Sequence, residues 1–240
     1  MESQSNSGKW LAAGLGLAAA GYATYASLAW SRYGSPSPSR PEEQDDVLDR
    51  FMPHFEVVER HHTNVAAPAE TTFEAAKEME LSSSPVVRAI FKGRELIFGT
   101  IPNERRQPKG IVAEMLSLGW GVLAETPGRE IVLGAVTKPW EPNVTFRPIA
   151  PDSFAAFGEP GYVKIAWTLR ADPVASNTSI FRTETRAVAT DEYARAKFRL
   201  YWSFVSPGIW LIRRMLLGPV KADAERRYRG GASAAPVSAG

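Results

Sequence analysis

The 240-residue chain contains no cysteine, which excludes disulfide bonds, thiolate nucleophiles and cysteine-ligated metal sites. It has only three histidines, His54, His61 and His62, so metal-binding side chains are scarce. The formal net charge is +2, and no strong overall field favours nucleic acid as a partner. Glycine-rich phosphate loops, the nucleophile-elbow motif and the paired-histidine zinc motif are also missing. These absences predict no metal, no cofactor and no nucleic-acid partner.

A long uncharged segment stands near the N-terminus, at residues 10–30. Trp10 and Trp30 mark its two ends. In a helix that rises ~1.5 Å per residue they lie roughly 30 Å apart, the thickness of the hydrocarbon core of a bilayer. Tryptophan favours the headgroup level of a membrane. The sequence therefore predicts one transmembrane helix after a short tail, residues 1–9. A cleaved signal peptide is the alternative, although the start holds Glu2 and no clear cleavage site follows.

Basic residues around this segment predict the orientation of the chain. One lysine precedes it, and three arginines follow it: Arg32, Arg40 and Arg50. The positive-inside rule therefore places the large domain in the cytoplasm, in a single-pass arrangement. Residues 31–46 contain many prolines, serines and acids and are expected to form a solvated linker. One folded domain is expected over residues 47–229, before a disordered tail of small residues at 230–240.

The periodicity of the folded part indicates a mixture of strands and helices. Strands are expected over residues 55–65, 120–125, 130–137, 143–148, 162–171 and 178–189, and helices over 69–79, 111–118 and 151–157, with another after Pro85. Thr190 and Asp191 are expected to cap a long last helix, which Pro207 should kink. An antiparallel sheet with one apolar face needs a cover. The amphipathic C-terminal helix is the expected cover.

Four stretches carry a resemblance to a known superfamily: FEVVERHH at 55–62, PGYVKIAW at 160–167, FRTETR at 181–186 and YWSFVSPGIWLIRR at 201–214. With this order of elements, the chain resembles the START-like, or SRPBCC, superfamily over about residues 50–228. In particular it resembles bacterial proteins described as polyketide cyclase/dehydrase-like. The resemblance implies an α+β helix-grip fold, in which an antiparallel sheet wraps around a long C-terminal helix, here preceded by one transmembrane helix. It also implies an apolar cavity between sheet and helix, and no catalytic residue is carried across because the superfamily has no universal catalytic motif.

Two groups of charged residues are candidates for the interior. Glu59 and His61 share one face of the first predicted strand, because alternate residues of a strand point to the same side. Such a pair is suited to act as a general base or to orient a polar ligand group, unless it is a satisfied pair at the rim of the sheet. Arg182, Glu184 and Arg186 share a face of the last predicted strand. This row either enters the cavity and grips an anionic group, or forms a solvated ladder of charges.

Aromatic side chains occur on both the predicted sheet and the predicted covering helix, where they suit the lining of a cavity for an apolar ligand. Ordinary core filling explains any single one of them. The candidate ligand-binding residues are Glu59, His61, Trp120, Trp140, Trp167, Glu184, Arg186, Phe198, Tyr201, Trp202 and Val205.

The sequence as a whole predicts a membrane-tethered protein that binds a hydrophobic small molecule or lipid, and binding without catalysis is favoured. Two alternatives stay open. One is a cyclase- or dehydratase-like enzyme for a polyketide-type substrate, with Glu59, His61 and Glu184 as its acid–base candidates. The other is a membrane-associated interaction protein without catalysis. Basic residues at 221–229 either complement the dipole of the last helix or contact the anionic inner leaflet. The oligomeric state is left open.

Overall fold

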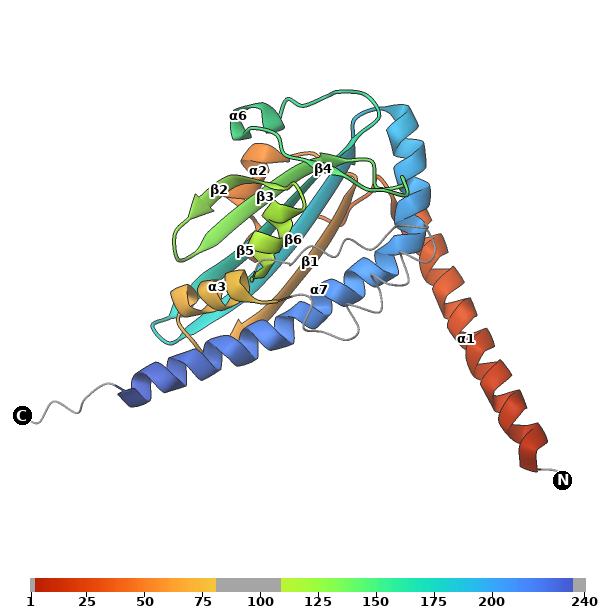
Figure 1. Cartoon of the computed structure of the whole chain (residues 1–240), viewed down its shortest axis with the longest axis horizontal. Helices are drawn as coiled ribbons and strands as arrows, with labels where there is room; N and C mark the ends of the chain where they lie inside the picture. The colour runs from red at the N-terminus through yellow and green to blue at the C-terminus, as the bar shows by residue number, and fades with distance from the viewer. Residues whose placement is uncertain (1–2, 81–108, 235–240) are drawn as a thin grey trace, which may run out of the picture.

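The computed structural model describes residues 3–80 and 109–234, and the predicted helix after Pro85 lies outside these ranges. Figure 1 shows an antiparallel sheet with the long helix α7 along one side and the helix α1 projecting away from the body. The described elements are, in chain order, α1 (Ser3–Arg32), the 3-10 helix η1 (Pro41–Glu43), α2 (Asp46–Phe51), β1 (Val57–Val65), α3 (Ala69–Glu78), α5 (Ile111–Ser117), β2 (Gly121–Thr126), β3 (Glu130–Thr137), β4 (Phe146–Arg147), α6 (Pro151–Phe154), β5 (Val163–Ala175), β6 (Thr178–Ala189) and α7 (Glu192–Ala234).

The sheet is antiparallel at each of its pairings, in the order β1-β6-β5-β3-β2, with the short β4 paired to β3. Strands β3 and β6 have the predicted bounds, and the other described strands differ from prediction by a few residues at their ends. In the register of the sheet, Glu59 lies opposite Thr185, and Thr185 lies opposite Trp167. Residues directly opposite one another share a face. These three side chains therefore form a row across β1, β6 and β5.

The two faces of the sheet are covered by different helices. The face that carries Trp167 packs against α3, α5 and the second half of α7, where Phe73, Ile111 and Leu216 are buried. The opposite face packs against α2 and α6. The α+β helix-grip arrangement predicted from the sequence is confirmed by this packing, because the sheet lies along the long C-terminal helix.

Helix α7 begins as predicted and bends in its interior. The Asp191 carboxylate accepts a hydrogen bond from the Ala194 N–H at 2.6 Å, which is the N-cap interaction. Pro207 lies inside the helix, where it removes a helical hydrogen bond. Figure 1 shows α7 in two parts, one beside the end of α1 and the other along the sheet. The helix continues to Ala234, so the first residues of the predicted disordered tail are helical.

The segment predicted to span a membrane lies within α1, and the helix itself forms. However, across residues 3–80 and 109–234, none of the helices is long and apolar enough to cross a membrane. The prediction of a transmembrane helix at residues 10–30 is corrected accordingly. Alanine and glycine make up about half of the segment and contribute little hydrophobic free energy, and its second half adds polar groups at Thr24 and Ser27.

Helix α1 packs against the first part of α7 through its second half. The Tyr22 hydroxyl donates a hydrogen bond to the Phe204 carbonyl oxygen. The Arg199 guanidinium donates to the Trp30 carbonyl oxygen at 3.0 Å and lies 4.2 Å from the centroid of the Trp30 ring. Just after α1, the Tyr33 hydroxyl donates to the buried Glu56 carboxylate at 2.7 Å. The described part of α1 is therefore held to the domain at its C-terminal end.

The chain between α1 and β1 lies against the face of the sheet opposite α7. Arg60 donates to the Ser37 carbonyl oxygen at 2.9 Å, and Arg170 donates to the Gln44 carbonyl oxygen at 2.8 Å. Asp45 is only 3% exposed, and it caps α2 by accepting from the Leu48 N–H at 2.8 Å. Part of the segment predicted to be a solvated linker is thus packed, because arginines of the sheet bind its carbonyl oxygens and carboxylates.

Candidate functional site

The candidate site lies between the sheet and the second part of α7. Glu59 and His61 project from β1 toward this space, with His61 Nε2 3.4 Å from Glu59 Oε2. Their side chains are only 15% and 8% exposed. The Trp210 ring of α7 meets the His61 ring edge-on, at 6.4 Å between centroids. A carboxylate beside an imidazole in such a place is able to exchange a proton or to orient a polar group.

Arg213 of α7 places a cation in the same space. Its guanidinium carbon lies 4.2 Å from the centroid of the Trp167 ring, and Trp167 is 1% exposed. Burial lowers the pKa of Arg213 to about 10, and the negative charge of Glu59 acts in the opposite direction. Arg213 is a cation at neutral pH all the same, because this pKa lies well above 7.

Several buried polar atoms around Trp167 lack a hydrogen-bond partner in the part of the chain that the structure describes. They are Thr185 Oγ1 and Trp120 Nε1, together with His61 Nε2, whose 3.4 Å contact with Glu59 does not have hydrogen-bond geometry. Trp120 meets Trp167 edge-on at 6.4 Å between ring centroids. Thr185 of β6 lies directly opposite Trp167 of β5 in the sheet. An unsatisfied buried polar group costs about 1–3 kcal/mol. Arg60 and Glu130, on the opposite face of the sheet, also have unpartnered atoms, but those around Trp167 lie on the face that α7 covers.

Neither of two pockets among the described residues is lined by Trp167 or Arg213, although His61 and Thr183 line the smaller one. The larger has a volume of about 370 Å³, lies where α1 meets α7, and is lined by Tyr33, Gly34, Glu56, Glu192, Arg195, Ala196 and Arg199. Its charged side chains already have partners, since Arg195 contacts both Glu56 and Glu192 and Arg199 donates to the Trp30 carbonyl oxygen. The smaller, of about 20 Å³, is lined mostly by charged and polar side chains. Neither of these two pockets is the predicted apolar cavity between the sheet and α7.

Most of the predicted cavity aromatics pack against one another. One cluster contains Tyr33 together with Trp140, Phe198, Tyr201 and Trp202. In it, the Phe198 ring lies 6.3 Å from the Tyr201 ring and 5.9 Å from the Trp202 ring, between centroids. Trp120 and Trp167 belong to the larger core beneath the second part of α7. Val205 is half-buried in α7. Binding of a ligand by these residues stays a prediction.

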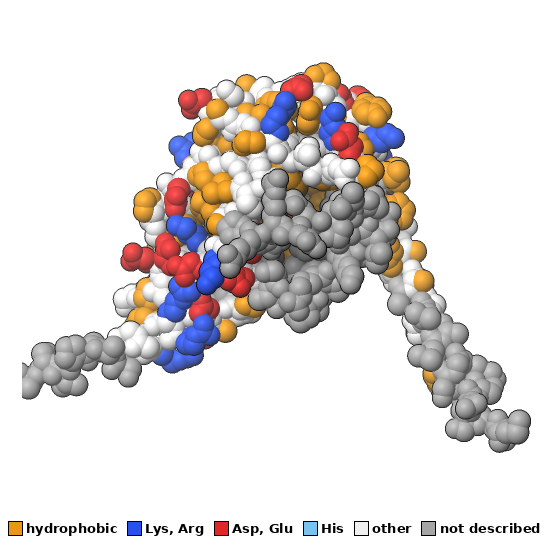
Figure 2. Space-filling view, viewed as in Figure 1, with side chains coloured by type: hydrophobic (Ala, Val, Ile, Leu, Met, Phe, Trp, Pro, Cys, Tyr) orange, Lys and Arg blue, Asp and Glu red, His pale blue; other side chains and the backbone are white. Residues whose placement is uncertain are grey.

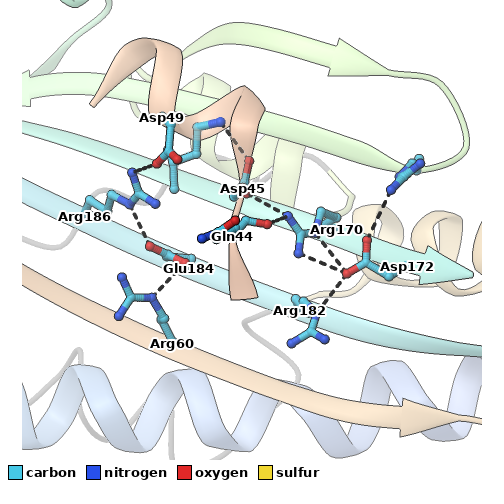
Figure 3. Close-up of polar contacts among 11 residues, drawn as sticks. Gln44, Asp45, Asp49, Arg60, Arg170, Asp172, Arg182, Glu184 and Arg186 are labelled. Atoms are coloured by element: carbon cyan, nitrogen blue, oxygen red, sulfur yellow. Dashed lines mark hydrogen bonds and ion pairs between the residues drawn. The ribbon is translucent and has the colours of Figure 1, made fainter. Parts of the chain in front are cut away.

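The charged row of β6 lies on the face of the sheet opposite this site, beneath α2 (Figure 3). Arg186 Nε donates to Glu184 Oε1 at 2.6 Å, and Arg60 Nε lies 3.0 Å from Glu184 Oε2. The predicted placement of Glu184 and Arg186 in the ligand space is therefore corrected. The row is not a solvated ladder either, because Glu184 is 6% and Arg186 2% exposed. Glu184 is on the wrong face to act together with Glu59.

The sequence contains one feature that could have identified Arg213 as a site residue: a charge on the apolar face of a predicted helix. Arg213 follows Ile209 by four positions and precedes Leu216 by three, so it stands on the stripe that faces the sheet. The other basic residues toward the C-terminus behave differently. Lys221 pairs with Glu225, and Arg227 pairs with Asp223. Figure 2 shows both signs of charge interleaved over this end of α7.

Within the described residues, no group of three or more histidine, aspartate or glutamate side chains is arranged to hold a metal ion. The site is built instead from one carboxylate, one imidazole and one guanidinium around a buried indole.

No protein-family model matches this chain, and no curated protein sequence matches it. Among solved structures it is similar to the Zhui aromatase/cyclase from Streptomyces sp. R1128, with 15% identity, a TM-score of 0.27, and coverage of 72% of this chain and 96% of that one. It is similar to protein CV1439 from Chromobacterium violaceum, with 11% identity, a TM-score of 0.33, and coverage of 70% and 97%.

The di-domain aromatase/cyclase BexL from the BE-7585A biosynthetic pathway is also similar, with 15% identity, a TM-score of 0.32, and coverage of 70% of this chain. This chain spans about half the length of BexL, 46%. Likeness at this level carries no activity over to the chain. The order of its own elements, with the sheet packed along α7, has the form of a START-like helix-grip protein, in agreement with the resemblance noted in its sequence.

Proposed function

We propose that this protein binds an apolar small molecule between its sheet and the second part of α7. The observation that carries the proposal is the group of polar side chains around Trp167 that are buried without full partners. Such groups are not expected in a core whose role is packing alone, because each buried polar group without a hydrogen bond lowers the stability of the fold. A ligand with an apolar body and a polar group would satisfy them.

Entry of the ligand requires the second part of α7 to move relative to the sheet. Pro207 and Gly208 provide a position for this motion, since proline removes a helical hydrogen bond and glycine adds backbone freedom. Arg213 and Trp210 lie just beyond the bend. A small tilt of α7 at the bend would therefore open the space beside Trp167.

Titration of the full-length protein with a fluorescent fatty acid or sterol is expected to give saturable binding. Thr185→Val removes one unpartnered hydroxyl at nearly constant shape and is expected to weaken binding about 5-fold, as for one neutral hydrogen bond. Thr126→Val is the matched control, because Thr126 is exposed at the end of β2, and its affinity should equal that of wild type. Binding that never saturates would contradict the proposal.

The contact between Glu59 and His61 favours a second candidate, an acid–base enzyme for a polyketide-type substrate. The two functions differ in what happens to the bound molecule. Recovery of the bound molecule unchanged supports the binding function. A product formed by the wild type and not by Glu59→Gln would select the enzyme, because glutamine keeps the shape and loses the base.

Attachment to a membrane through α1 is a further part of the proposal. Helix α1 supports it, because no charged residue lies between Trp10 and Trp30 and its apolar side chains Trp10 and Leu17 are 78% and 76% exposed. Leu17→Glu is expected to move the protein from the membrane pellet to the supernatant after sedimentation. Val174→Glu introduces the same charge at a 64% exposed position in β5 and should leave it in the pellet. Equal behaviour of both variants would contradict attachment through α1.

A further inference from the structure

We infer that the ligand of this site carries an anionic group, a carboxylate or a phosphate, which binds the guanidinium of Arg213. The inference rests on the proposed binding function and specifies the chemistry of its ligand.

The geometry of Arg213 leaves its donors available. The guanidinium carbon is 4.2 Å from the centroid of the Trp167 ring, so one face of the cation is covered by the indole. The N–H donors of a guanidinium lie in its plane and point outward from its edge. Stacking therefore orients these donors without occupying them, which is the arrangement that binds carboxylates and phosphates in a bidentate way.

Arg213 differs from the arginines buried on the other face of the sheet. There, each shielded arginine has a carboxylate close by: Arg60 and Glu184 at 3.0 Å, Arg170 and Asp172 at 3.0 Å, Arg182 and Asp172 at 2.8 Å, and Arg186 and Glu184 at 2.6 Å. Within residues 3–80 and 109–234, Arg213 has no carboxylate at ion-pair distance; the acidic group that acts on it is Glu59, from farther away. Arg213 is half-buried and stacked on an indole, so it has lost part of its hydration, and the absence of an adjacent anion is therefore costly. An acidic ligand would supply the missing charge.

The other groups facing Arg213 define where the anion sits. Glu59 repels an anion, and its contact with His61 at 3.4 Å lies on the β1 side of the space. Thr185 stands between Glu59 and Trp167 in the sheet, with a buried hydroxyl that has no described partner. The anion is therefore expected above β5 and β6, between the Arg213 guanidinium and the Thr185 hydroxyl. The apolar side chains Leu169 and Leu216 near Trp167 would contact the body of the ligand.

Calorimetric titration of the full-length protein with dodecanoate, dodecyl phosphate and dodecanol tests this inference, because the three share one apolar chain. Wild type is expected to bind at least one of the two anions about 10-fold or more tightly than dodecanol, as for a charge-assisted hydrogen bond. The tighter of the two anions tells a carboxylate ligand from a phosphate one. Arg213→Met keeps the apolar stem and should bring the three ligands within about 3-fold of one another, with dodecanol binding unchanged.

Arg214→Met is the matched control, since Arg214 is exposed and lies 5.7 Å from the Trp210 ring; it should keep the full preference for the anion. Arg213→Lys keeps the positive charge but lacks the planar guanidinium that binds in a bidentate way, so it should show an intermediate preference for the anion. This variant tests the inference if Arg213→Met does not fold. Equal binding of dodecanol and both anions by wild type would overturn the inference and leave the binding function standing. A full preference in Arg213→Met would overturn it as well. Binding of none of the three would overturn the binding function.

Discussion

Arg186→Ala is expected to lower the free energy of unfolding by about 3–5 kcal/mol, because it breaks a buried charge network from one side. Arg186 is 2% exposed, and its guanidinium donates to Glu184 at 2.6 Å and to the Met52 carbonyl oxygen at 2.8 Å. It also binds Asp49 of α2 and lies 4.6 Å from the centroid of the Phe55 ring. Its loss leaves Glu184 buried with one ion-pair partner fewer and removes the polar contacts that Arg186 makes with Asp49 and Met52. Urea denaturation measures the difference.

Arg50→Ala is the matched control for this experiment. Arg50 belongs to the same helix α2, but it is exposed, and its guanidinium carbon lies 5.8 Å from the centroid of the Phe51 ring. Removal of an exposed cation of this kind changes stability by no more than about 0.5 kcal/mol. A similar loss in both variants would show that the network around Arg186 contributes no more than surface charge does.

The second large effect is a loss of stability as the pH rises, centred on Glu130. Burial, followed by the negative charge of Asp45, raises the pKa of Glu130 to about 8 from its ordinary value of 4.5. The folded state therefore holds a proton that the unfolded state releases, so this stabilising contribution is complete below about pH 4.5 and is lost as the pH approaches 8. Between pH 6 and pH 8 the free energy of unfolding should fall by about 2 kcal/mol from this group.

Glu130→Gln is expected to remove that pH dependence, since an amide cannot ionise and still offers a hydrogen-bond donor to Asp45. Urea denaturation at pH 6, 7 and 8 measures the slope. Glu125→Gln on the neighbouring strand β2 makes the same substitution at a carboxylate that is 38% exposed and paired with Lys77, and it should keep the slope of wild type. An unchanged slope in Glu130→Gln would locate the titrating group elsewhere.

Local patterns in the sequence determined much of the secondary structure. The bounds of β3 and β6 were predicted correctly because their flanks carry turn residues and their own residues alternate or are strongly apolar. The cap at Asp191 and the bend near Pro207 were predicted because both depend on the chemistry of single residues. Helix α2 was not predicted. It is short, and its position depends on the distant residues Arg170 and Arg186.

The sequence also identified Glu59, His61 and Trp167 as candidates, but it did not determine which charged residues share their space. Alternation in β6 says that Glu184 and Arg186 lie on one face and Thr183 and Thr185 on the other, without saying which face meets α7. The face of β6 that meets α7 is determined by the hydrophobic cores on the two sides of the sheet. It also depends on the acidic residues before β1 that bind Arg170 and Arg186.

By itself, then, the sequence determined the order of the elements, the capped and bent last helix, and the absence of cysteine chemistry. Only the tertiary structure decided that the charged row of β6 lies beneath α2 and that Arg213 lies on Trp167. The physical reason is that strand and helix periodicities are local, whereas the facing of a strand and the partner of a charge depend on residues far apart in the chain.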